Sequence, residues 1–159
     1  MVGFKVFAKL LDRGTFKDPE KAHEELAVSA GRKVKAVGEL ATPMKRASIY
    51  LDRWVQQNFK TEGGNVGGWQ PFAFGGRLIP GGGLDTSAKL LQDTGRLRAS
   101  FTPYHSKKDA GIFSELDYSE KHHEGIGIPQ RRLLPLDAEV KDDVRAIIEG
   151  HIAKALKVK

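Results

Sequence analysis

The chain has 159 residues, of which 40% are hydrophobic and 29% are charged. This length suits one globular domain over residues 1–159 and is too short for two good cores. The chain contains no cysteine, which excludes disulfides, thiolate catalysis and every zinc site built with cysteine. The formal net charge of +6 permits contact with DNA without requiring it.

No stretch approaches the roughly 18 uninterrupted apolar residues of a membrane span. The first five residues also lack the charged, apolar and small-residue regions of a signal peptide. We therefore expect a soluble protein that is made in a cytoplasm and has no membrane partner.

The N-terminal part predicts two elements with thin patterns. Residues 4–10 alternate only partly, which favours a strand and leaves a short helix as the alternative. Asp18 suits a helix N-cap and Pro19 a first helical position, so a helix is expected from there to about residue 37. Its apolar stripe is thin, and this helix needs a neighbour to stabilise it.

The strongest helix is expected to begin at Thr42 and Pro43, a capping hydroxyl followed by a proline in the first turn. Its core-facing positions recur every three or four residues and fall on one stripe. They are Met44, Ala47, Leu51, Trp54, Val55, Asn58 and Phe59. We expect this to be the main core helix, with Trp54 and Phe59 in the core rather than in a ligand-stacking site.

A glycine-rich segment follows, and nine of the chain's 18 glycines lie between Gly63 and Gly83. Such a segment cannot hold a regular helix and loses much backbone entropy when it is ordered, so we expect a long loop over residues 63–83. A flexible linker has no need of Trp69, Phe72 and Phe74. We expect part of the loop to dock on its own fold or on an adjacent subunit and to act in assembly.

The next segment predicts a short helical patch at residues 87–91 and then a hairpin. Residues 100–105 and 110–115 are expected to be its strands, joined by a turn at residues 106–109.

Two helices are expected in the last third of the chain. The first covers residues 118–123 and ends at Gly125, before an extended loop over residues 125–129. The second is amphipathic and runs from Asp137 to about residue 156. The chain therefore predicts an α+β fold, in which a small antiparallel sheet with a hairpin packs against long amphipathic helices and a long glycine-rich loop intervenes.

No catalytic motif stands out. The glycines of residues 63–83 follow a helix, whereas a phosphate-binding loop follows a strand and opens a helix. His122 and His123 would point about 100° apart on a helix and could not easily share a metal ion, so surface or interface positions are favoured. The neighbouring serines lack a Gly-x-Ser-x-Gly elbow and a placed acid. We expect no enzymatic activity, no cofactor and no metal.

Basic residues predict two kinds of contact. Phosphates need only charge, and four residues of the hairpin half are candidates for lining a DNA channel: Arg96, Arg98, Lys107 and Lys108. Arginine's planar fork suits either a carboxylate of the next subunit or a phosphate, and for Arg131 and Arg132 we favour pairing between subunits. The candidates for a subunit or partner interface are Trp69, Phe72, Phe74, Arg77, Arg131 and Arg132.

Three blocks of sequence occur in an informative order. Residues 91–101 contain leucine, two residues, threonine, glycine, x, leucine, x, x and serine before a hairpin. Tyr118 is followed by His122, His123 and Gly125, and residues 128–134 read Ile-Pro-Gln-Arg-Arg-Leu-Leu. With the tryptophan of Gly-Gly-Trp-Gln-Pro and the closing helix, these blocks resemble the virion-morphogenesis or tail-completion family of tailed bacteriophages, typified by the G protein of Mu-like phages.

The resemblance implies a small α+β subunit that forms a ring, with six copies the expectation, at the head-proximal end of the tail. Such a ring allows a finished tail to join a DNA-filled head. The implied partners are other copies of the chain, tail terminator or tail tube and sheath proteins, head-completion, adaptor and portal proteins, and genomic DNA through non-specific contact. The implied location is the virion neck, after assembly in the bacterial host's cytoplasm. The alternative is an assembly factor or DNA-binding protein that is absent from the finished virion.

Overall fold

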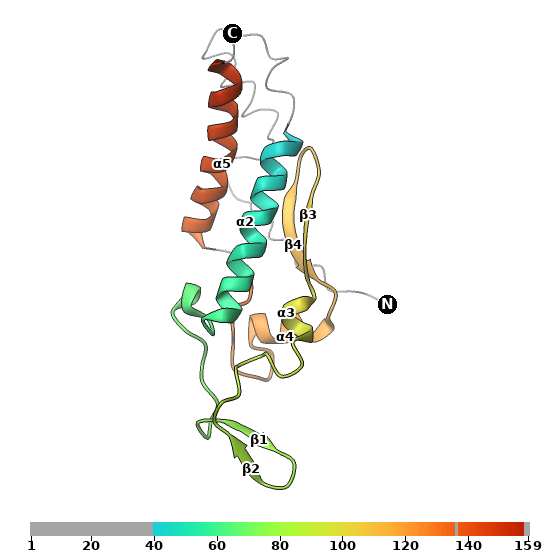
Figure 1. The fold of residues 1–159 in the computed structure, drawn as a ribbon, viewed down its shortest axis with the longest axis vertical. Coiled ribbons are helices and arrows are strands. Elements are labelled where there is room, and N and C mark those ends of the chain that lie inside the picture. Colours follow the sequence, from blue (N-terminus) through green and yellow to red (C-terminus); the bar gives the residue numbers. More distant parts are fainter. Residues whose placement is uncertain (1–39, 136, 158–159) are drawn as a thin grey trace. The chain divides into compact units, whose positions relative to one another are not determined.

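The computed structural model describes residues 40–135 and 137–157, and the elements expected at residues 4–10 and from Asp18 lie outside them. The described elements, in chain order, are α2 (Ala41–Lys60), the 3-10 helix η2 (Gly64–Val66), β1 (Arg77–Ile79), β2 (Gly83–Asp85), α3 (Arg96–Ala99), β3 (Phe101–His105), β4 (Ala110–Ser114), α4 (Asp117–Glu124) and α5 (Ala138–Lys157) (Figure 1). In the described part, the strands form two antiparallel two-stranded sheets, β1–β2 and β3–β4. The predicted α+β class is confirmed.

The described residues fall into two compact units. The first contains residues 52–102 and 113–134, and the second contains the remaining described residues. α2, β3 and β4 contribute residues to both units. The expectation of a single domain stays a prediction.

α2 is a 20-residue helix with one buried stripe, as its periodicity predicted. Its buried side chains include Met44, Ala47, Ser48, Leu51, Val55, Asn58 and Phe59. Trp54 is only half-buried, because it lies at the edge of this stripe, so its predicted core position is wrong. Asn58 is fully buried, and its amide nitrogen donates to the Arg132 carbonyl at 2.9 Å, whereas its Oδ1 has no hydrogen-bond partner among the described residues.

In the second unit, α5 runs beside the first half of α2 (Figure 1). Buried α5 side chains recur every four residues, at Val140, Val144, Ile148 and Ile152. The Tyr50 hydroxyl of α2 donates to the Asp143 carboxylate of α5. Burial and this carboxylate raise the pKa of Tyr50 above its ordinary value. The predicted closing helix is confirmed.

In the first unit, aromatic side chains form the centre of the core. The Phe59 ring lies 5.2 Å from the Trp69 ring, in an edge-on arrangement, and 5.8 Å from the Phe101 ring. Leu97 of α3 is buried in the same unit. The end of α2 is therefore joined to the glycine-rich segment and to the start of β3 through one aromatic cluster.

Two local predictions differ from the structure. Residues 87–91 are not helical, because the Asp85 carboxylate accepts hydrogen bonds from both the Ser87 backbone and hydroxyl, a turn that competes with helix. The predicted loop at residues 63–83 contains η2 and most of the β1–β2 hairpin. By contrast, the hairpin turn after residue 105 and the α4 helix ending at Gly125 are confirmed.

None of the helices in residues 40–135 and 137–157 is long and apolar enough to cross a membrane.

Candidate assembly interface

The glycine-rich segment leaves α2 through a tight left-handed turn. Glu62 and Gly63 have φ angles of 52° and 90°. The Gly63 N–H donates to the Asn58 carbonyl, and the Trp69 N–H donates to the Glu62 carbonyl, both at 2.8 Å. A Cβ on Gly63 would lie 2.6 Å from the backbone nitrogen of Trp69, so the close return of the chain requires glycine.

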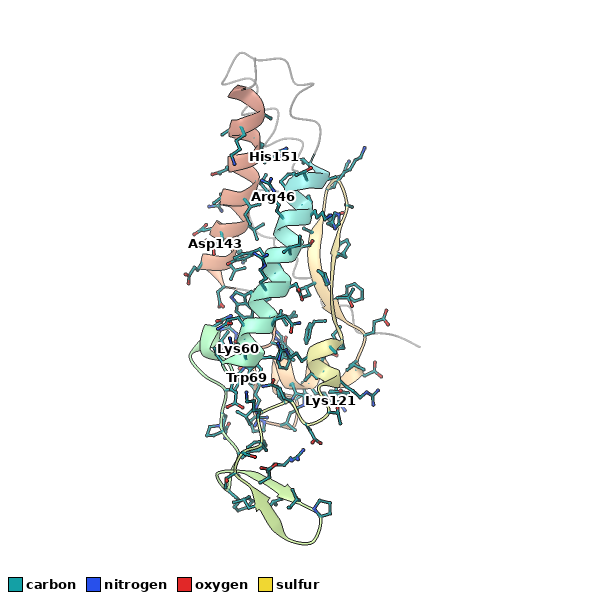
Figure 2. The ribbon with its side chains drawn as sticks, viewed as in Figure 1. Arg46, Lys60, Trp69, Lys121, Asp143 and His151 are labelled. Atoms are coloured by element: carbon teal, nitrogen blue, oxygen red, sulfur yellow. The ribbon has the colours of Figure 1, made fainter. Side chains whose placement is uncertain are left out.

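Trp69 fixes this segment to the core of the first unit. Its side chain is only 6% exposed, and the indole N–H donates to the Arg132 carbonyl at 3.0 Å. In Figure 2, Trp69 lies just beyond the end of α2, near Lys60. Of the two outcomes expected for the loop, docking on its own fold therefore holds for Trp69, whereas Phe72 is half-buried and Phe74 is 69% exposed.

The β1–β2 hairpin presents an apolar face to solvent. Its register pairs Arg77 with Asp85 and Leu78 with Leu84. Arg77 and Asp85 form an ion pair at 3.5 Å, which puts Leu78 and Leu84 on the opposite face. These two leucines are 63% and 43% exposed. An isolated two-stranded hairpin is marginally stable in water, so a bare leucine face on one is a candidate binding surface.

Polar contacts hold the base of this hairpin. The Leu90 N–H donates to the Glu62 carboxylate at 2.6 Å, and the Gln92 amide donates to the Phe59 carbonyl at 2.8 Å. Arg77 also pairs with Asp93. These contacts join the residues next to the two strands to the rest of the first unit, and they hold the hairpin with its leucine face in place.

A cavity of about 210 Å³ adjoins the hairpin base. Its lining includes Phe72, Arg77, Leu97, Tyr118 and His122. Arg77 Nε and His122 Nδ1 are buried and have no hydrogen-bond partner within the described part of the chain. Unsatisfied buried nitrogens are costly, so these two atoms reduce the stability of the hairpin base.

The paired histidines of α4 hold the segment that follows it. His123 is 4% exposed, and its Nδ1 accepts a hydrogen bond from the Leu133 N–H at 3.0 Å. The His122 carbonyl accepts from the Arg131 N–H at 2.7 Å. The surface position expected for these histidines is therefore wrong for His123, because its ring supplies the acceptor that a buried amide needs.

Arg131 and Arg132 both form hydrogen bonds within the chain. The Arg131 side chain is 9% exposed, and its guanidinium donates to the Gln70 carbonyl at 3.1 and 3.3 Å. Burial lowers the pKa of Arg131. The Arg132 carbonyl accepts from both Asn58 and Trp69. This network joins the glycine-rich segment to residues 131–133, and a role in pairing between subunits stays a prediction for both arginines.

The His123 contact makes stability depend on pH. Burial lowers the pKa of His123 below 6.5, with Glu124 opposing the shift and Arg132 adding to it. A depressed pKa means that the unfolded chain binds the proton more tightly. The stability contributed by the neutral His123 ring is therefore complete above pH 6.5, and it is lost as the pH falls through the lower pKa of the folded state.

We expect the unfolding free energy to fall more steeply below pH 6.5 in the wild type than in His123→Gln, which does not titrate. Urea titrations across this pH range measure the difference. His105→Gln, at an exposed position, is the control and should keep the wild-type dependence. Parallel curves for the wild type and His123→Gln would contradict the assignment.

The candidate DNA-channel residues are divided between the two units. Arg96 is exposed and Arg98 is half-buried on α3, where Arg98 Nε donates to the Gln56 amide oxygen at 2.7 Å. Lys107 and Lys108 are exposed in the β3–β4 turn, which belongs to the other unit.

Sequence reasoning missed the buried roles of His123 and Arg131, and it placed Asn58 on the core stripe without its hydrogen bond to Arg132. Only the position of Asn58 on the core stripe of its helix gave a usable signal. Within the described ranges, no group of three or more His, Asp or Glu side chains is arranged to hold a metal ion.

Comparisons of the chain with protein-family models, with curated proteins and with solved structures find no match.

Proposed function

We propose that the chain is a non-catalytic structural subunit of a tailed-bacteriophage neck, a tail-completion ring protein that joins the tail to the DNA-filled head. The observation that carries the proposal is the exposed Leu78 and Leu84 face of a hairpin whose base is held by the rest of its unit. The three sequence blocks that resemble the tail-completion family supply the identity of the assembly.

The polar residues of those blocks support a structural role. The side chains of His123 and Arg131 form hydrogen bonds with backbone groups of their own chain. A side chain that is bonded to the backbone in this way holds a segment of the chain in place, which is a structural role. The segment after α4 is thereby fixed to the glycine-rich segment that carries the hairpin.

A ring imposes a further requirement, because its contacts are heterologous and join two different surfaces of the same chain. The leucine face of the hairpin supplies one such surface. The cavity beside the hairpin base, lined by Arg77 and His122 among others, supplies a second surface. Both surfaces lie in the first unit.

The double variant Leu78→Ser with Leu84→Ser tests the assembly role. We expect it to stay monomeric under conditions in which the wild type forms rings, because the interface loses its exposed apolar side chains. Native mass spectrometry measures the oligomer, and thermal unfolding should be nearly unchanged, since both side chains already face solvent.

Ile49→Ser with Ile126→Ser is a matched control. It removes two apolar side chains that are 39% and 55% exposed elsewhere on the chain, and it should assemble like the wild type. Rings of normal size formed by the hairpin variant would refute the assembly role of the leucine face.

The second candidate function is an assembly factor or DNA-binding protein of the same particle, favoured by the net charge of +6. Mass spectrometry of purified virions of the encoding phage separates the two. A neck subunit is present in stoichiometric amounts in mature particles, whereas an assembly factor is found only in infected-cell lysates.

A further inference from the structure

The outward face of α2 is strongly and uniformly basic. Its exposed charged side chains are Lys45, Arg46, Arg53 and Lys60. The only acidic residue of the helix is Asp52, which is half-buried at the edge of the core stripe and accepts a hydrogen bond from Gln56. Four cations against one acid give α2 a charge of +3, half of the chain's net +6.

Three of these cations form a line. Arg46, Arg53 and Lys60 are seven residues apart, and a straight helix turns by only about 20° from exact repetition over seven residues. They therefore lie within about 40° of one another, opposite the buried stripe, and follow each other at about 10.5 Å along the axis. Figure 2 labels Arg46 in the first half of α2 and Lys60 at its end.

Within the described part of the chain, no acidic side chain neutralises these cations. None of the ion pairs within residues 40–135 and 137–157 involves Lys45, Arg46, Arg53 or Lys60. The other 20-residue helix, α5, is different, because acidic and basic residues alternate on its outward side and Asp142 pairs with Arg145 at 2.8 Å. The outward side of α5 is therefore of mixed charge, whereas the outward face of α2 is basic.

We propose that the outward face of α2 binds the phosphate backbone of duplex DNA without reading its sequence. Phosphate contacts need cations and hydrogen-bond donors, and the face offers little else. A protein partner would need an apolar centre, whereas the one large exposed apolar side chain of α2 is Ile49, at 39% exposure. A row of cations about 21 Å long is enough to follow several phosphates.

This site is distinct from the hairpin interface, so it is tested on the isolated chain. The probe is a short fluorescein-labelled duplex of mixed sequence, and its binding to the full chain is followed by anisotropy over a range of salt concentrations. Three phosphate contacts give a logarithmic salt slope of about 2.7, which corresponds to about a 40-fold loss of affinity between 50 and 200 mM salt.

The triple variant Arg46→Gln, Arg53→Gln and Lys60→Gln should lower the affinity at 50 mM salt by at least tenfold and reduce the slope to near zero. The matched control is Lys121→Gln, Lys141→Gln and Lys154→Gln, which removes three exposed cations from α4 and α5. It should bind within about twofold of the wild type. Both variants should keep the wild-type melting curve.

Two results would overturn the proposal. In one, the two triple variants lose affinity equally, which would show that only net charge matters. In the other, the wild type binds poly-glutamate but not the duplex, which would assign the face to an acidic protein. Ring formation by the α2 variant, measured by native mass spectrometry, tests the neck role separately, because loss of DNA binding with intact rings leaves that role standing.

Discussion

Trp69→Ala is expected to reduce the unfolding free energy by about 3–5 kcal/mol, the range for truncating a buried aromatic side chain. The substitution removes the edge-on contact with Phe59 and the indole hydrogen bond to the Arg132 carbonyl. It also removes the side chain that holds the glycine-rich segment against the end of α2. Equilibrium unfolding in urea, followed by far-ultraviolet circular dichroism, measures the loss.

The chain has only two tryptophans, so Trp54→Ala is the natural control. Trp54 is half-buried, and its truncation should cost about half as much. Trp69→Phe separates the two contributions of Trp69, because it keeps an aromatic ring and removes the hydrogen bond, at about 1 kcal/mol. If Trp54→Ala proved the more damaging variant, Trp69 would not be the anchor of the segment.

The sequence predicted the long helices best, because their signal is repeated many times. α2 and α5 each bury one stripe over several turns, and a single exception such as Trp54 does not obscure the pattern. The β3–β4 hairpin was also predictable, since Ser106 to Asp109 form a polar turn between apolar strands. Such elements are determined by local spacing.

The β1–β2 hairpin was not predicted, because each strand has only three residues. Alternation cannot be recognised over so short a span, and the many glycines indicate a loop. Pro80, Gly81 and Gly82 do mark its turn, and Gly81 and Gly82 have φ angles of 95° and 86°. The apolar pair beside this turn was the available signal.

The candidate site was only partly predictable, because its polar residues act through contacts distant in sequence. Trp69 meets Arg132 across 63 positions and Arg131 meets Gln70 across 61. Nothing local distinguishes an arginine that donates to such a carbonyl from one that faces a partner. The α2 basic face was readable from spacing alone, once the core stripe of the helix had been assigned.

Gly63→Ala is expected to destabilise the protein by about 3 kcal/mol, for two separable reasons. The left-handed conformation of Gly63, at φ 90°, costs an L-residue about 1–2 kcal/mol. The added Cβ would also lie 2.6 Å from both Cγ and the backbone nitrogen of Trp69, and relieving such an overlap adds about 1–3 kcal/mol.

Gly67→Ala isolates the first of these costs. Gly67 has a φ of 84°, and a Cβ there would meet nothing within 4 Å, so only the conformational penalty of about 1–2 kcal/mol applies. Urea unfolding of both variants gives the difference, and the excess loss in Gly63→Ala measures the close packing of Trp69 on the turn. Equal losses would mean that the turn can open at little cost and that Trp69 is held by its contacts with Phe59 and Arg132 alone.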